Sequence, residues 1–321
     1  MKNNILTIIL IIAITIIIAT IGSFILKIDH GTVVKNPFEL NIDSIGNIDK
    51  AKFCKLDTSN FKTQLQNSTA IAIDKNENIY VSGDNEIAIF TNNGQKKTAI
   101  KTEGTATALA IDKNNILYAA IANQIVAYLA EGSIRNRWSV DSPKAIITSL
   151  AVGNSIFVAD ANEAIVFEYD LKGTFIRTIG SKNKDDIDCF VLPSKYFDIA
   201  IGSDSSLWVA NPGKHLLVNF KKDGTIKSSW GKSSANLKDF CGCCNPSHFA
   251  IGSDGSFITS EKGLVRVKRY NSSGTFECAI AGPQHFDAGA TGLDIAFGSN
   301  NNIFILEPKA GVIHIFKEIS K

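Results

Sequence analysis

The sequence predicts an all-β fold, a β-propeller of six blades, and three observations support this prediction. A short apolar strand, a polar turn and a second apolar strand recur six times, as in TAIAIDKNENIYV from Thr69 and DIAIGSDSSLWVA from Asp198. Glycine-containing hairpins such as Asp223-Gly224 follow within the repeats. One alanine marks the same position in every copy, at spacings of 38 to 50 residues: Ala72, Ala110, Ala151, Ala200, Ala250 and Ala296. A repeat of about 40 to 50 residues with four strands is typical of propeller blades.

Four strands are expected in each repeat, and the copy over residues 196–231 shows them most clearly. Its first strand, FDIAIG, is apolar on both faces, as expected for an inner strand enclosed by the neighbouring blades. The strands LWVAN and HLLVNF follow it. The Asp223-Gly224 hairpin then leads into an outer strand, TIKSSWG, because glycine accepts the positive φ that such turns require.

The sixth repeat lacks a fourth strand. Five repeats carry the outer strand, but the last one ends with VIHIFKE at residues 312–318. A sheet one strand short would leave an unpaired edge. We therefore expect residues 52–56 to supply the missing strand and close the ring, so that the propeller spans residues 51–321.

The outer strands carry a further pattern. KGTFIRTIG and DGTIKSSWG, with their Gly-Thr turn and terminal glycine, resemble NHL repeats, and the resemblance covers roughly residues 68–318. Propellers of this family include binding scaffolds, lyases and hydrolases. The resemblance therefore implies a fold more than a function.

An apolar segment precedes the propeller. No charged side chain lies between Lys2 and Lys27, and the 22 residues from Ile5 to Leu26 are rich in isoleucine. About 20 apolar residues span a bilayer as a helix, whereas the apolar part of a cleaved signal peptide usually has about 7 to 15. We expect a signal anchor over residues 1–27, with cleavage as the alternative, and a linker over residues 28–50. The propeller would then lie outside the cytoplasm, on the periplasmic side of a membrane.

The overall charge excludes one class of partner. The chain has 33 basic and 31 acidic residues, a formal net charge of +2, and its lysines are scattered. Nucleic acid is therefore not expected as a partner. The expected partners are the membrane, through the N-terminal helix, and a protein or small ligand bound to one face of the propeller.

Candidate binding residues are predicted from propeller geometry. The connection between blades and the loop between the second and third strands of a blade emerge on the same face. This placement predicts a common binding face around the channel mouth, made by Asn211, His215, His248, Glu261, Lys262 and Glu307.

A cysteine-rich loop, FCGCCNPSH, precedes the fifth inner strand. Disulfide formation is one interpretation, because the six cysteines are an even number and the expected compartment is oxidising. Cys189 lies in the preceding interblade connection and could pair with this loop, while Cys54 and Cys278 on outer strands are either paired or buried. A metal or redox site is the alternative. Thiolates and imidazole suit Cu, Zn or Fe, and the candidate ligands are Cys189, Cys241, Cys243, Cys244 and His248.

These observations predict a membrane-tethered, extracytoplasmic propeller that acts as a binding or interaction scaffold, more than an enzyme. A metal- or redox-site accessory protein that uses the cysteine loop is the main alternative. A propeller lyase or hydrolase that uses Glu261, Lys262 and Glu307 is the second. The sequence contains no GxSxG, Walker or HExxH motif that would identify a reaction.

Overall fold

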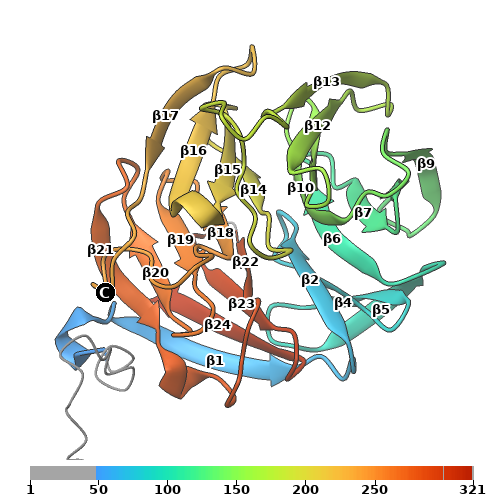
Figure 1. Ribbon diagram of the computed structural model, residues 1–321. Coiled ribbons are helices and arrows are strands. Elements are labelled where there is room, and N and C mark those ends of the chain that lie inside the picture. Colours follow the sequence, from blue (N-terminus) through green and yellow to red (C-terminus); the bar gives the residue numbers. More distant parts are fainter. Residues whose placement is uncertain (1–47, 299, 320–321) are drawn as a thin grey trace, which may run out of the picture. The chain divides into compact units, whose positions relative to one another are not determined.

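The computed structural model describes residues 48–298 and 300–319, which form six four-stranded antiparallel sheets (Figure 1). Blade 1 contains β2 (Ser68–Ile73), β3 (Ile79–Gly83), β4 (Glu86–Phe90) and β5 (Lys96–Lys101). Blade 2 contains β6 (Ala106–Ile111), β7 (Leu117–Ile121), β8 (Gln124–Tyr128) and β9 (Ile134–Ser139). Blade 3 contains β10 (Ile147–Val152), β11 (Ile156–Asp160), β12 (Ile165–Tyr169) and β13 (Phe175–Ile179).

The second half of the ring repeats this arrangement. Blade 4 contains β14 (Ile199–Ile201), β15 (Leu207–Asn211), β16 (Leu216–Phe220) and β17 (Ile226–Trp230). Blade 5 contains β18 (His248–Ile251), β19 (Phe257–Ser260), β20 (Val267–Tyr270) and β21 (Phe276–Ala281). Blade 6 contains β22 (Asp294–Phe297), β23 (Ile303–Glu307), β24 (Val312–Glu318) and β1 (Leu56–Lys62). Three short 3₁₀ helices, η1 (Lys50–Lys52), η2 (Pro212–Lys214) and η3 (Pro283–His285), lie in the connections.

The six sheets close into a ring, which confirms the predicted six-bladed propeller. The first strand of each blade contacts the first strand of the next, in the order β2, β6, β10, β14, β18 and β22, and β22 contacts β2. The hydrophobic core lies between adjacent sheets. In blade 5, for example, Phe257 packs on Trp208 and Trp230 of blade 4, with ring centroids 4.8 and 5.1 Å apart. These aromatic side chains fill the space between two blades, as their place on strands predicts.

Ring closure uses the N-terminal strand, as expected, but at different residues. β1 pairs with β24 from Leu56 to Lys62, whereas the sequence predicts the strand at residues 52–56. The residues just before β1 follow a neighbouring edge instead, because the Cys54 amide donates to the Ala279 carbonyl of β21 in blade 5. β1 is polar and mostly exposed, so no apolar alternation marks its bounds.

The predicted membrane segment lies outside this part of the chain. No helix within residues 48–298 and 300–319 is long and apolar enough to cross a membrane. The signal anchor expected over residues 1–27 and the linker up to residue 47 belong to the residues that are not described. Both stay predictions.

Candidate functional site

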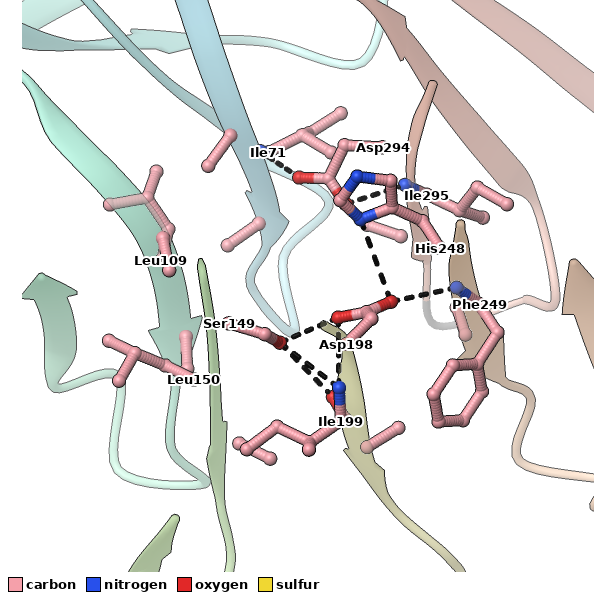
Figure 2. Close-up of a pocket in the computed structure, with 18 of the residues that line it drawn as sticks. Ile71, Leu109, Ser149, Leu150, Asp198, Ile199, His248, Phe249, Asp294 and Ile295 are labelled. Atoms are coloured by element: carbon pink, nitrogen blue, oxygen red, sulfur yellow. Dashed lines mark hydrogen bonds and ion pairs between the residues drawn. The ribbon is translucent and has the colours of Figure 1, made fainter. Parts of the chain in front are cut away.

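A cavity opens where the inner strands begin, and it shares lining residues with the central channel, of which Figure 2 shows the lining. The outer part, which we call the mouth, has a volume of about 380 Å³, and the channel below it about 270 Å³. Thr69, Thr107, Thr148 and His248 line both. The mouth also takes residues from an interblade connection (Tyr196) and from loops of blade 6, which agrees with the predicted convergence of loops at one face.

The channel wall carries ionisable side chains on one half only. Two residues before the repeated alanine, the six inner strands carry, in blade order, Ala70, Ala108, Ser149, Asp198, His248 and Asp294. Blades 1 and 2 thus present methyl groups, and blades 4 to 6 present two carboxylates with an imidazole between them. His248 was predicted from the sequence, whereas Asp198 and Asp294 were not, although a comparison of this one position across the six repeats distinguishes both.

His248 lies between the two aspartates. Its Nδ1 is 3.7 Å from Asp198 Oδ2 and 3.7 Å from Asp294 Oδ1, and its side chain is 15% exposed. Each aspartate also holds a neighbouring blade. Asp198 Oδ2 accepts a hydrogen bond from the Phe249 amide at 2.7 Å, and Asp294 Oδ2 accepts one from the Ile71 amide at 2.9 Å. Ser149 donates to Asp198 Oδ1 at 2.6 Å, so the cluster is firmly positioned (Figure 2).

The surroundings raise the pKa of both His248 and Asp294, for different reasons. Burial opposes the charged imidazolium, but Asp198 and then Asp294 outweigh it and raise the pKa of His248. Burial, together with the nearby Asp198, raises the pKa of Asp294 from 3.8 to about 6, although His248 and two backbone amides favour its charged form. A carboxyl group whose pKa is about 6 titrates close to neutral pH, and such groups are suited to general acid and base catalysis.

The mouth above His248 combines an aromatic wall with cationic side chains. The Tyr196 ring packs edge-to-face on the His248 ring, with centroids 5.5 Å apart, and the Lys262 ammonium lies over the Tyr196 ring, 5.0 Å from its centroid. Lys195 and Lys309 are exposed and also line the mouth. A bound molecule would therefore meet two lysines at the rim and the His248 cluster below.

The other predicted binding residues lie elsewhere on the same face of the fold, and none of them lines the mouth. Asn211 is buried and ties two backbone groups of the preceding connection, the Val191 amide at 2.9 Å and the Cys189 carbonyl at 3.0 Å. His215 ends η2 in a left-handed conformation with φ 56°. Glu307 accepts from the Asp287 amide at 2.9 Å and pairs with His314 at 3.0 Å.

Glu261 belongs to a buried ionic network. Its Oε2 is 2.6 Å from Arg266 Nε and 3.2 Å from Lys268 Nζ, and all three side chains are 1% exposed or less. Its Oε1 accepts from the Cys241 amide at 2.8 Å. Burial lowers the pKa of Lys268 to about 8, although Glu261 favours the charged form. Through the Cys241 amide, this network holds the cysteine loop. It was not predicted from the sequence, because a charged residue in a loop is usually solvated.

One disulfide is formed, between Cys54 and Cys278, with the two Cα atoms 5.3 Å apart. It joins the segment before β1 to the outer strand of blade 5, one of the two arrangements considered for this pair. Cys189, Cys241, Cys243 and Cys244 are free thiols. Cys189 interacts with Lys214 Nζ at 3.3 Å and with the Lys184 carbonyl at 3.2 Å, so it is not bonded to the cysteine loop.

The metal hypothesis for this loop stays a prediction. Within residues 48–298 and 300–319, no three or more His, Cys, Asp or Glu side chains are grouped closely enough to hold a metal ion. Of the candidate ligands, His248 faces Asp198 and Asp294, each 3.7 Å from its Nδ1. Cys243 and Cys244 contact each other, with 3.0 Å between their sulfurs.

Comparison with known proteins agrees on the fold. No protein family and no curated protein matches this sequence. Among solved structures, a virginiamycin B lyase from Staphylococcus aureus aligns with a TM-score of 0.59 and 15% identity, covering 83% of this chain and 100% of the lyase. A streptogramin B lyase aligns with a TM-score of 0.57 and 13% identity, covering 82% of this chain and 97% of that one. A gluconolactonase from Xanthomonas campestris aligns with a TM-score of 0.62 and 14% identity, covering 83% and 91%.

These similarities establish a six-bladed propeller fold whose structural neighbours include lyases and a lactonase. At such low identity they concern the fold alone. The resemblance to NHL repeats stays a prediction.

Proposed function

We propose that this protein binds a small anionic molecule at the mouth and that His248 acts on it as a general acid and base, in a lyase or hydrolase reaction. The observation that supports this most is the position of His248, held 3.7 Å from each of two carboxylates at the wall of an open cavity. The exposed Lys195 and Lys309 at the rim favour a negatively charged ligand. The cavity volume of about 380 Å³ is within the range of small-molecule sites.

A purely structural role for the cluster explains less. In blades 1 to 3 the bond to the next blade at this level comes from a neutral hydroxyl: Thr69 to the Ala106 carbonyl, Thr107 to the Ile147 carbonyl and Thr148 to the Phe197 carbonyl. Joining blades therefore requires no charge. Placing two carboxylates and a histidine at largely buried positions costs free energy, and such groups are often retained for chemistry.

The residues would divide the work as follows. The imidazolium of His248 donates a proton from the ring to a leaving oxygen, and the neutral ring takes up a proton from water or from a carbon next to a carbonyl. Asp198 and Asp294 hold the ring in place and stabilise its charged form. Tyr196 forms the wall that orients the ligand over the ring. One structural neighbour is described as a catalytically inactive histidine-to-alanine virginiamycin B lyase with quinupristin, so a histidine is essential in that protein.

The test is turnover of a defined panel, which is glucono-δ-lactone, a small aryl ester that carries a free carboxylate, and quinupristin, followed by proton release or by loss of the starting material. With any substrate that reacts, His248→Gln should lower kcat/KM by about 100-fold or more, the usual contribution of an acid–base group. His314→Gln is the matched control, because His314 pairs with a carboxylate at 3.0 Å outside the mouth. Equal rates for the His248 variant and the wild type, or no turnover of any of the three compounds, would overturn the catalytic proposal.

A membrane-tethered, extracytoplasmic binding scaffold is the second candidate. Three exposed apolar side chains favour it: Ile146 at the mouth, and Ile187 and Val191 on the connection that leads to Tyr196. Exposed apolar groups gathered on one face often mark a protein contact. A photo-crosslinking residue at position 187 should then label a partner in cells. Absence of any labelled product would count against the scaffold.

A further inference from the structure

We propose that Cys243 and Cys244 form a reversible thiol–disulfide exchange site that reacts with disulfides and closes a bond between the two adjacent residues. Their sulfurs are 3.0 Å apart, only about 1 Å longer than a disulfide bond. Cys243 is exposed to solvent and Cys244 is buried. The Cys243 thiol can therefore react with an external reagent, and the Cys244 thiol lies close enough to react with Cys243 afterwards. This inference is independent of the function proposed for the mouth.

The loop that carries the pair is fastened on both sides. The Asn245 side chain donates from Nδ2 to the Lys262 carbonyl at 3.0 Å and accepts at Oδ1 from the Lys262 amide at 2.9 Å. The Cys241 amide is bound by the buried Glu261, and the Ser247 amide donates to the Ser260 carbonyl at 2.9 Å. Only residues 242–244 are free of these attachments. Gly242, at φ +86°, provides the turn that presents the pair.

The surroundings assign different roles to the two sulfurs. Burial raises the pKa of Cys244, but Lys262, Cys243 and Ser194 outweigh it and lower the pKa overall. The hydrogen bond with Cys244, and its charge, raise the pKa of Cys243. Cys244 is therefore the first to lose its proton, and it can accept the proton of Cys243 across the 3.0 Å contact.

The exchange then proceeds in two displacements. The Cys243 thiolate attacks one sulfur of a disulfide RSSR, which breaks the S–S bond, forms Cys243–S–SR and releases RS⁻. That RS⁻ takes the proton now on Cys244. The Cys244 thiolate next attacks the Cys243 sulfur, closes the Cys243–Cys244 bond and releases a second RS⁻. The pair loses two electrons and RSSR gains them.

Adjacency makes the product reversible. Consecutive Cα atoms are about 3.8 Å apart, below the usual range of about 4.4 to 6.8 Å for disulfides. Strained disulfides are the more easily reduced ones, and they serve as labile or regulatory bonds more often than as permanent links. The pair therefore differs from Cys54–Cys278, which spans distant parts of the chain and is suited to a structural role.

The test uses the full chain and glutathione disulfide as the probe. After oxidation, quenching with acid and alkylation of the denatured protein with N-ethylmaleimide, the number of alkylated thiols should fall by two from the four free ones, with no glutathione retained. Cys244→Ser should stop at one glutathione adduct, carried by Cys243, and Cys244→Ala should do the same if the serine variant folds poorly. Cys241→Ser is the matched control and should behave as the wild type.

Three outcomes would overturn the proposal: no loss of thiols in the wild type, a glutathione adduct that persists in the wild type, or loss of the internal bond in Cys241→Ser. The last would show that Cys241 is the true partner of Cys243. Repeating the reaction with an oxidised protein disulfide isomerase, which is a stronger oxidant than thioredoxin, distinguishes a protein donor from a small-molecule donor. Lys262→Met should slow the exchange several-fold at pH 7, because Cys244 then loses a cationic neighbour.

Discussion

Replacing Asp294 by asparagine should stabilise the folded protein at neutral pH. The same replacement should lower the activity proposed for the mouth, because Asp294 holds His248 in place. The pKa of this carboxyl is raised from 3.8 to about 6, so the folded protein binds its proton more tightly than the unfolded chain does. Its stabilising contribution is complete below about pH 3.8 and is lost as the pH rises through 6. Asparagine resembles the protonated acid, and its side-chain oxygen can still accept the hydrogen bond from the Ile71 amide.

The magnitude follows from the pKa difference. At about 1.4 kcal/mol per pKa unit, ionising Asp294 lowers the free energy of unfolding by about 3 kcal/mol above pH 6. The side chain is only 18% exposed, so solvent screens little of this cost. Asp294→Asn should therefore be more stable than the wild type by up to about 3 kcal/mol at pH 7.5. The advantage should shrink between pH 6 and pH 4.

Urea unfolding at half-unit steps from pH 4 to pH 8 measures this difference. Taking variant minus wild type at each pH cancels the titrating groups that do not interact with Asp294, while the contribution of His248, which does, stays in the difference. Asp204→Asn is a control of opposite sign, because Lys227 and Ser206 lower the pKa of that carboxyl to about 2, so its loss should destabilise the protein above pH 4. A pH-independent difference for Asp294→Asn, or a destabilisation that grows as the pH rises, would refute the reasoning.

Three further predictions concern stability. Cys278→Ala should lower the free energy of unfolding by about 2 to 4 kcal/mol, because the disulfide to Cys54 closes a loop over a sequence separation of 224. Adding Cys54→Ala to this variant should not lower the melting temperature further. Deleting residues 56–62 should expose the edge of β24 and lower Tm by 10 °C or more, with aggregation in light scattering, whereas an unchanged melt would refute closure by β1. Glu261→Gln should cost about 3 to 5 kcal/mol in urea unfolding, because two cations stay buried, while the exposed Glu277→Gln should cost under about 1.

The fold could be read from the chain because its signals are local and repeated. The strands predicted as LWVAN and HLLVNF match β15 and β16, since each combines an apolar run with a turn at its end. The bounds of β1 were not predicted correctly. Its sequence LDTSNFK is polar, its outer face is exposed, and only pairing with β24, more than 200 residues away in sequence, defines its bounds.

The site was only half visible from the sequence. His248 was placed at the mouth because it begins an inner strand next to an unusual loop. Asp198 and Asp294 begin strands that seemed ordinary by themselves, and their meaning appears only when three neighbouring blades are compared. Glu261 and Glu307 were expected at the same mouth but are buried, because each pairs with a side chain of the strand that follows it, Lys268 or His314.

The sequence by itself determined the number of blades, the four strands within each, and the need for an N-terminal strand to close the ring. These features depend on the alternation of apolar and polar residues and on turn residues. Both patterns extend over a few neighbouring positions and can be recognised without the tertiary structure. The tertiary structure decided which charges face water and which face one another. Residues about 50 positions apart meet only when the ring has closed. Their pKa values, the free or bonded state of each cysteine, and the composition of the mouth therefore depend on contacts that no local pattern encodes.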